Sequence, residues 1–272
     1  MVTGGYFCSA GHTEAGGMDA FLRKLAPHVH WQRCFPAVSK PAPKLGRPHA
    51  VPSTEHSGTT GQQLVERMLD CLQRHHRGRA CQLDFVLLID DADCRFASTV
   101  DARAARTEWE AELTRQVRQY TDRPTLGFYV LLASPEIEAW LMADWENGFG
   151  RAFPDASISL RQHFETCVLP PLSWDRMEEF GGRLIGGSCE TKLSRKIAES
   201  FDISADCQCR PPLRERIQRQ AGKVPISYSK RIDGPAMLKR IEPSVVARRC
   251  PSFRVVYERL RQADSFGEAG SG

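Results

Sequence analysis

The stretch Asp84-Phe-Val-Leu-Leu-Ile-Asp-Asp-Ala-Asp93 decides the fold class, because an uninterrupted apolar run ends there in clustered carboxylates. A short apolar run flanked by charge is typical of a strand that is buried on both faces of a parallel sheet. The segment Gly127 to Ala133 has the same character, and the polar segment 101–119 between the two predicts a helix. Two buried strands joined by a helix indicate a parallel β-α-β unit.

The same alternation of strands and helices extends on both sides of this unit. Residues 5–10 predict a short strand, followed by a turn and a helix that runs through Leu25. Prolines spread over the segment 36–61 exclude a regular helix and predict a long loop, and apolar residues at helical spacing predict a helix from Gln62. The segment 134–136, Ser-Pro-Glu, predicts a helix start, with serine as the cap and proline at the first helical position. This order predicts an α/β fold with a doubly wound, mostly parallel sheet and helices on both faces.

Strand patterns are hard to find in the second half of the chain, which reads as helices broken by Gly-Gly and Pro-Pro pairs. We therefore predict an α/β domain over 1–150, a helical and basic C-terminal part over 151–264 that packs on it, and a flexible tail over 265–272.

Charge is divided unequally along the chain. Residues 1–180 hold 19 Lys and Arg against 23 Asp and Glu, whereas residues 181–272 hold 18 against 10. A basic C-terminal part suggests a polyanionic partner, and an arginine-rich solvated helical surface is the alternative.

The composition, with 41% hydrophobic and 26% charged residues, is that of a globular protein. The longest apolar runs fall far short of the roughly 20 residues of a membrane-spanning helix, and the N-terminus lacks the charged and apolar regions of a signal peptide. The ten cysteines are scattered, and the one close pair, Cys207 and Cys209, lacks further ligands for zinc, so most are expected to be reduced core residues. We therefore expect a soluble, cytoplasmic protein that does not associate with membranes.

Three carboxylates, Asp90, Asp91 and Asp93, directly follow the central buried strand, at the sheet edge where open α/β folds bind ligands. Because neighbouring carboxylates repel one another, three of them within four residues favour a hard divalent cation, Mg²⁺ or Mn²⁺. The alternative is a plain acidic loop, since aspartate is common in turns. Glu138 begins a helix after the next strand and is expected at the same edge.

Two further groups are candidates for the same site. The turn Ala10-Gly-His-Thr-Glu14 follows the first predicted strand and places a carboxylate at a helix start. Glu14 is a candidate catalytic residue, and the alternative is that it only stabilises the N-terminus of that helix.

The second group is basic, and it is expected to bind the phosphates of a nucleic acid without reading the base sequence. Its members fall within one or two helical turns or beside a turn, and they are Lys192, Arg195, Lys196, Lys230 and Arg231. Aromatic residues are sparse around them, which does not favour recognition of single strands by stacking.

The order of these motifs resembles the TOPRIM-like proteins of a widespread bacterial domain family of unknown function. The resemblance rests on the small turn ending in Thr13-Glu14, the Asp91-x-Asp93 pair after a strand, and Ser-Pro-Glu-x-Glu-Ala-Trp-Leu over 134–141. It continues in the segments 190–197, 228–234 and 250–253 and covers most of the chain, with 36–61 matched least.

The resemblance implies a TOPRIM fold, in which a glutamate after the first strand acts as general acid or base and the Asp-x-Asp pair binds magnesium. Members of the family begin with Glu-Gly-x-Thr-Glu, whereas this chain has Ala10 at the position of the first glutamate. Three explanations are open on the sequence: a natural degenerate protein, a protein in which Glu14 has taken over, or an engineered inactive variant.

We therefore expect a magnesium-dependent nuclease that acts on DNA or RNA phosphodiesters, in which Asp91 and Asp93, with Asp90 or Glu138, hold the cation. The resemblance further implies a role in bacterial anti-phage defence beside an ATPase partner, and the sequence leaves a homo-oligomer open. A non-catalytic subunit that binds nucleic acid or a partner, with a vestigial metal site, is the alternative that Ala10 favours. A small-molecule phosphotransferase or phosphatase that uses the same acidic edge is a third.

Overall fold

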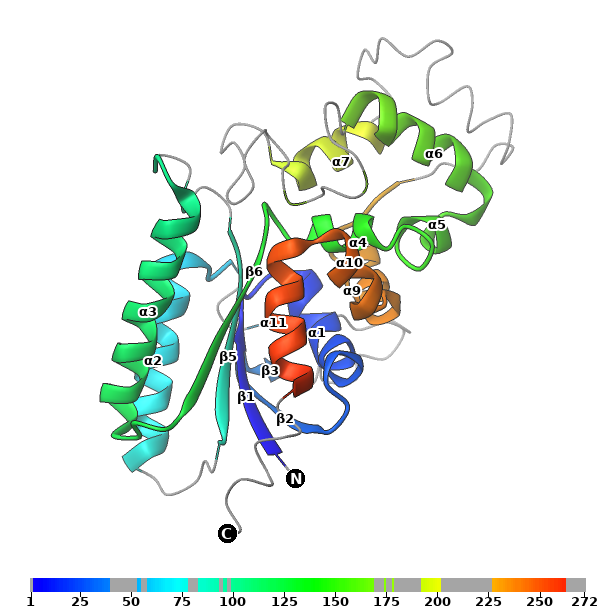
Figure 1. Cartoon of the computed structure of the whole chain (residues 1–272). Coiled ribbons are helices and arrows are strands. Elements are labelled where there is room, and N and C mark those ends of the chain that lie inside the picture. The colour runs from blue at the N-terminus through cyan, green and yellow to red at the C-terminus, as the bar shows by residue number, and fades with distance from the viewer. Residues whose placement is uncertain are drawn as a thin grey trace.

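Four parallel strands form the central sheet, and they lie in the order β2-β1-β5-β6 (Figure 1). The strands are β1 (Val2–Cys8), β2 (Val29–Phe35), β5 (Phe85–Asp91) and β6 (Gly127–Ala133). The parallel pairing of β1, β5 and β6 confirms the α/β fold that the three apolar segments predict. The computed structural model describes residues 2–39, 53–54, 58–77, 83–92, 95–96, 99–168, 174, 178, 192–201 and 227–262.

Strand β5 lies between β1 and β6, and its side chains alternate between two hydrophobic cores. Val86 and Leu88 pack in the core on one face, whereas Leu87 and Ile89 pack in the core on the other. Helices cover both faces, which explains why the apolar run has no polar interruption.

Helices α2 (Gly61–Arg77) and α3 (Ala102–Thr121) cover one face of the sheet (Figure 1). The residues of α2 that follow helical spacing are all buried, as predicted, and they are Leu64, Val65, Met68, Leu69 and Leu72. Helix α3 is mostly polar and buries only Leu113, Val117 and Thr121. Its first turn is capped by Asp101, which accepts two backbone N–H groups at 3.0 and 2.9 Å.

The other face is covered by α1 (His12–Leu25), α9 (Asp233–Arg240), α10 (Pro243–Arg249) and α11 (Pro251–Gln262). The ring of Phe21 in α1 stacks on Trp140 with 5.7 Å between centroids and lies 5.9 Å from the ring of Phe253 in α11. A Cβ atom on Gly17 would lie 2.7 Å from Cβ of Leu238, so α1 and α9 approach more closely than a larger residue allows. The hydrophobic core on this face therefore joins the first helix to the last three.

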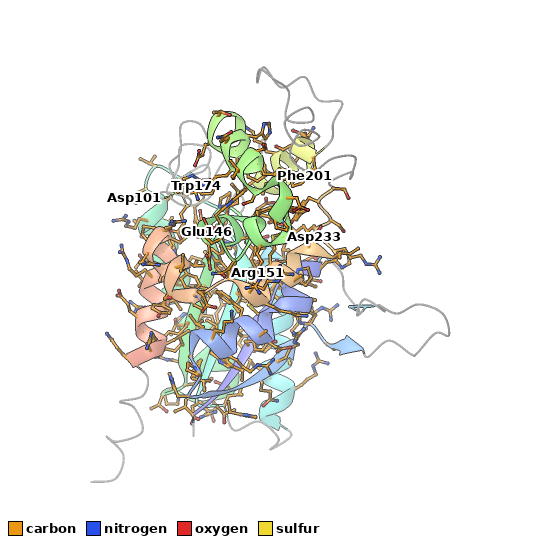
Figure 2. All side chains as sticks on the ribbon, turned by 90° about the vertical axis from the view of Figure 1, so that its right-hand side faces the viewer. Asp101, Glu146, Arg151, Trp174, Phe201 and Asp233 are labelled. Atoms are coloured by element: carbon orange, nitrogen blue, oxygen red, sulfur yellow. The ribbon has the colours of Figure 1, made fainter. Side chains whose placement is uncertain are left out.

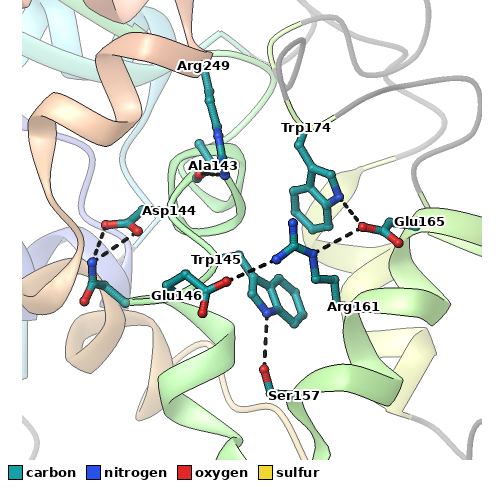
Figure 3. Close-up of polar contacts among 10 residues, drawn as sticks. Ala143, Asp144, Trp145, Glu146, Ser157, Arg161, Glu165, Trp174 and Arg249 are labelled. Atoms are coloured by element: carbon teal, nitrogen blue, oxygen red, sulfur yellow. Dashed lines mark hydrogen bonds and ion pairs between the residues drawn. The ribbon is translucent and has the colours of Figure 1, made fainter.

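Short helices lie at the carboxyl end of the sheet: α4 (Glu138–Ala143), α5 (Phe149–Ala152), the 3₁₀-helix η1 (Pro154–Ala156), α6 (Ser157–His163), the π-helical turn η2 (Phe164–Val168) and α7 (Leu193–Phe201). Figure 3 shows polar contacts around α4, α6 and η2. Arg161 of α6 donates to Glu146 and Glu165 at 3.1 and 3.2 Å and lies over the ring of Trp174. Together with α9, α10 and α11, this region makes the described residues after 137 mainly helical, as expected.

The structure corrects two details of the sequence analysis. Strand β2 is not apparent from the sequence, because it is an edge strand with partly exposed polar residues such as Gln32 and Arg33. The helix after β6 begins at Glu138 and not at Ser134. The backbone N–H of Ile137 donates to Asp91 Oδ1 at 2.8 Å, so a carboxylate from the end of β5 takes the place of the predicted serine cap.

Two further segments bear on the predicted loop and tail. Within the proline-rich loop, β3 (Val38–Ser39) and β4 (Ser53–Thr54) pair in antiparallel fashion. The predicted tail at 265–272 lies outside the described residues. Among the helices that the structure describes, none is long and apolar enough to cross a membrane.

Candidate functional site

Three carboxylates from distant parts of the chain converge at the carboxyl edge of the sheet. Glu14 lies in the first turn of α1, Asp91 is the last residue of β5, and Glu138 is the first residue of α4. Glu14 and Glu138 are buried, with 2% and 0% exposure, whereas Asp91 is partly exposed. Their charges act on one another, since Glu14 and Glu138 both contribute to a raised pKa of Asp91. We call Glu14, Asp91 and Glu138 the acidic cluster.

Lys230, in the loop before α9, supplies a positive charge to this cluster. Its Nζ atom lies 2.9 Å from Oε1 of Glu138. Burial alone would lower the pKa of the Lys230 ammonium, but the negative charges of the acidic cluster raise that pKa above its ordinary value. The sequence predicts Lys230 as a phosphate contact, and the structure places its ammonium against a carboxylate.

One ammonium does not offset the removal of the acidic cluster from water. Burial raises the pKa of Glu138 to about 7, although the charge of Lys230 acts in the opposite direction. Burial is also the largest cause of the raised pKa values of Glu14 and Asp91. The cluster therefore favours protons or a further cation.

Several buried oxygens of the cluster accept no hydrogen bond from the described residues. Oε1 of Glu14 accepts the hydroxyl of Ser9 at 2.9 Å, but Oε2 has no donor. Oε2 of Glu138 also has no donor, and Oε1 has only the ion pair with Lys230. A buried acceptor without a partner is unfavourable by about 1–3 kcal/mol.

Oxygen atoms of this kind suit a hard divalent cation, which prefers carboxylate and water ligands. Within the described segments, however, no three His, Cys, Asp or Glu side chains are arranged so that they could hold one metal ion. Mg²⁺ is commonly held by one or two carboxylates with water in the remaining positions. Asp91 and Glu138 therefore fit such an ion in number and chemistry.

Asp90 is not brought to the acidic cluster. Its Oδ2 atom accepts the guanidinium of Arg95 at 2.7 Å and the N–H of Gly61 at 2.8 Å, on the face that α2 and α3 cover. The reason is the alternation of side chains along β5, which sends neighbouring residues to opposite faces. Asp93, the other predicted metal ligand of this motif, lies outside the described residues.

Ala10, at the position where the resemblance places a glutamate, is fully buried in the core under α2 and α3. Its N–H donates to the carbonyl of Thr59 at 3.0 Å, and its carbonyl accepts the N–H of Gly58 at 3.2 Å. The Ala10 side chain therefore packs in the opposite core from α1, which carries Glu14.

The other predicted basic residues lie on the surface near α7 and α9. Lys192 is exposed, with Nζ 3.9 Å from Oε1 of Glu136. Arg195 is exposed and pairs with Glu199 at 2.7 Å. Lys196 is partly exposed in α7, and Arg231 is exposed beside Lys230.

The structure adds two residues that sequence reasoning did not select. Glu136 accepts the N–H and the hydroxyl of Ser194 at 2.7 and 3.0 Å, which fixes the first turn of α7, and its charge contributes to the raised pKa of Glu138. Glu136 belongs to the Ser-Pro-Glu segment, but the sequence pattern predicts it as part of the following helix.

The second added residue is Tyr228, and no motif marks it. Its ring packs against Phe149 and Phe201, with centroids 5.5 and 5.9 Å away, and Figure 2 labels Phe201 in α7. Burial raises the pKa of the Tyr228 hydroxyl, and the nearby charge of Glu138 adds to this effect.

Comparison with known proteins finds a family model that matches most of the chain. The model of a family described as Domain of unknown function (DUF4276) matches residues 11–261, a span that begins directly after Ala10. No curated protein and no solved structure matches the chain.

Proposed function

The chain belongs to the DUF4276 family, a domain family of unknown function, and we propose that its acidic cluster is the active site of a metal-dependent nuclease of the TOPRIM type. The observation that carries the proposal is the convergence of Glu14, Asp91 and Glu138 at the carboxyl edge of a parallel sheet. Open α/β sheets bind their ligands at this edge. Burial of like charges at one place is typical of catalytic sites.

Asp91 and Glu138 are the residues that would hold a divalent cation. When bound, Mg²⁺ would polarise the phosphate and stabilise the leaving oxygen. The support for this assignment is the Oε2 atom of Glu138, which is buried and has no hydrogen-bond donor among the described residues.

Glu14 is the candidate for proton transfer. Burial raises its pKa, which brings the carboxyl group closer to the neutral pH at which a general acid or base is most effective. The hydroxyl of Ser9 orients one carboxylate oxygen and leaves Oε2 to accept a proton from an attacking water. In this role Glu14 replaces the glutamate that the family pattern has at the position of Ala10.

The substrate that fits this part of the molecule is a polyanion. The segment 181–272 has 18 basic against 10 acidic residues, and Lys192 and Arg231 are exposed near the site. Contacts of this kind bind phosphates of either DNA or RNA. An ATPase partner and a role in anti-phage defence stay predictions from the resemblance.

A second candidate function is a non-catalytic subunit that binds nucleic acid or a partner protein. Its support is Ala10, which lacks the carboxylate of the family pattern and is locked in the core by backbone hydrogen bonds to the loop at Gly58 and Thr59. In this case Lys230 would serve only to neutralise a vestigial cluster.

A nicking assay tests the two functions against each other. Purified protein is incubated with supercoiled plasmid or with RNA, in the presence of Mg²⁺ or Mn²⁺, and compared with the variants Asp91→Asn and Glu138→Gln. Asparagine keeps an oxygen for the N–H of Ile137, removes the charge and replaces the second oxygen by an NH₂ group. We expect each variant to reduce cleavage about 100-fold or more, because a bound metal ion contributes several kcal/mol of transition-state stabilisation.

The exposed residue Glu258 of α11 provides a matched control, and Glu258→Gln is expected to cleave like the parent protein. Equal cleavage by all four proteins would exclude the acidic cluster as the active site. Binding of nucleic acid without any cleavage would instead favour the non-catalytic subunit.

A further inference from the structure

The loop that carries Lys230 is fixed by contacts on both of its sides. The hydroxyl of Thr13 donates to the carbonyl of Lys230 at 3.4 Å. The N–H of Ser229 donates to Oδ2 of Asp233 at 2.7 Å, and its carbonyl accepts the N–H of Asp233, also at 2.7 Å. A Cβ atom on Gly234 would lie 2.2 Å from Oγ1 of Thr13, so α9 begins in direct contact with α1. Asp233 is labelled in Figure 2, in which the face formed by α1 and α9 is turned toward the viewer.

This construction places the ammonium of Lys230 against Glu138, whose Oε2 atom has no hydrogen-bond donor among the described residues. Oε1 of Glu138 lies 2.9 Å from Nζ, and Glu138 itself is 0% exposed. The side chain of Lys230 is 37% exposed, so the lysine has a path to solvent that Glu138 lacks.

A divalent cation bound to Glu138 would compete with the ammonium of Lys230 for the same carboxylate. A bound cation lies about 2.0–2.6 Å from its oxygen ligands, so the two positive charges would lie within roughly 5 Å of each other. At such a distance, and away from bulk water, like charges repel strongly.

We infer that Lys230 is the resident counter-ion of the acidic cluster, and that a divalent cation displaces it from Glu138 on binding. The inference rests on the proposed function, because it uses the carboxylates that are proposed to hold the cation. The displaced ammonium stays tethered by its fixed loop and turns to solvent, where a phosphate group of the substrate is the ligand that suits it. The cation and the phosphate then favour each other's binding, because each binds more tightly when the ammonium of Lys230 is displaced from Glu138.

Titration of the full chain with Mn²⁺, followed by the electron paramagnetic resonance signal of the free ion, tests the inference. We expect Lys230→Met to bind Mn²⁺ about tenfold more tightly or better, because the competing charge is gone while the length of the side chain is kept. Lys230→Arg keeps the charge and should retain the affinity of the parent protein. Lys239→Met, an exposed residue of α9, is the matched control and should also leave the affinity unchanged.

A second measurement uses the unaltered protein. Lysine side chains are acetylated briefly with and without Mn²⁺, and the modified positions are quantified by mass spectrometry. We expect Mn²⁺ to raise the labelling of Lys230, because its ammonium leaves Glu138, and to leave the labelling of Lys239 unchanged.

The outcomes separate the inference from the proposed function. If Lys230→Met binds Mn²⁺ no more tightly than the parent protein, the inference is wrong while the metal site stands. If none of the four proteins binds Mn²⁺, the proposed metal site itself fails. If Lys230→Met does not fold without metal, the labelling decides, and unchanged labelling of Lys230 at saturating Mn²⁺ overturns the inference.

Discussion

Glu138 shows at the scale of one residue how burial and charge oppose each other in this protein. The side chain is fully buried, and its one cationic contact among the described residues is the ammonium of Lys230. Burial raises the pKa of Glu138 from 4.5 to about 7 in the folded protein. The folded state therefore holds a proton over a range of pH in which the unfolded chain has lost it.

This difference predicts the direction of a pH effect on stability. Since the folded state binds more protons than the unfolded chain between the two pKa values, Glu138 lowers the free energy of unfolding as pH rises, by at most about 1.4 kcal/mol per pH unit. We expect stability to fall less steeply in Glu138→Gln between about pH 5 and 7 in metal-free urea denaturation, while Glu14 and Asp91, whose pKa values are also raised, keep their share of the decline. Glu258→Gln, at an exposed position, should keep the slope of the parent protein. If the free energy of unfolding changed with pH in the same way in Glu138→Gln and in the parent protein, the raised pKa of Glu138 would be contradicted.

The acidic motif also shows what a sequence can and cannot reveal at this scale. Its position at the carboxyl edge follows from the apolar run that precedes it. The apolar run does not reveal that the side chains of Asp90 and Asp91 lie on opposite faces of the sheet. This placement depends on β5 continuing through Asp91, whereas the apolar run ends at Ile89. A strand that is two residues longer sends adjacent carboxylates to opposite faces.

At the scale of secondary-structure elements, many helices of this protein begin at a carboxylate that another part of the chain supplies. Among the described helices, five have such a cap: Asp90 for α2, Asp91 for α4, Glu136 for α7, Asp144 for α10 and Glu178 for α11. A carboxylate at a helix N-terminus accepts free N–H groups and interacts favourably with the helix dipole. The acidic residues at the sheet edge thus serve in part to anchor helices.

Glu178 offers the clearest test of this role. It is fully buried and accepts the N–H groups of Ser252 and Phe253 at 2.6 and 3.1 Å. We expect Glu178→Ala to lower the free energy of unfolding by about 1–3 kcal/mol, because both donors lose their acceptor. Glu178→Gln keeps one acceptor oxygen and should lower the free energy of unfolding by a smaller amount. Urea denaturation measures both, and equal stability of Glu178→Ala and the parent protein would show that the cap contributes nothing.

A distant cap explains why α4 does not begin where the sequence predicts. Rules for capping read residues within four positions of the helix start. The start of α4 is fixed instead by Asp91, which lies 46 residues earlier, so the local Ser-Pro-Glu signal points to the wrong residue. Helix α2 was predictable, because its position depends on the spacing of its own apolar residues.

At the scale of the whole molecule, one hydrophobic core links the first helix to α9, α10 and α11. Met18 and Phe21 of α1 share this core with Leu238 of α9 and Phe253 of α11. The boundary predicted near residue 150 follows a change of sequence pattern, whereas the core includes residues from both sides of it. Sequence patterns reveal elements, but not which elements far apart in the chain will pack together.

A fragment of residues 1–150 tests how far this core is shared. Without α9, α10 and α11, the apolar residues of α1 and of that face of the sheet would be exposed to water. We expect the fragment to lack cooperative unfolding and to bind a hydrophobic dye, whereas the full chain unfolds in one transition. Scanning calorimetry and dye fluorescence check this expectation. A fragment that unfolds cooperatively would show that the first half forms a self-sufficient domain.

The contact between α1 and α9 has a consequence for the synthesis of this protein. A ribosome that adds about 5–20 residues per second releases α1 roughly 10–40 s before α9. During that interval the face of α1 around Gly17, which packs on Leu238 of α9, has no covering helix. Nascent chains in this condition are clients for chaperones that shield apolar segments, and slowing translation should prolong their exposure.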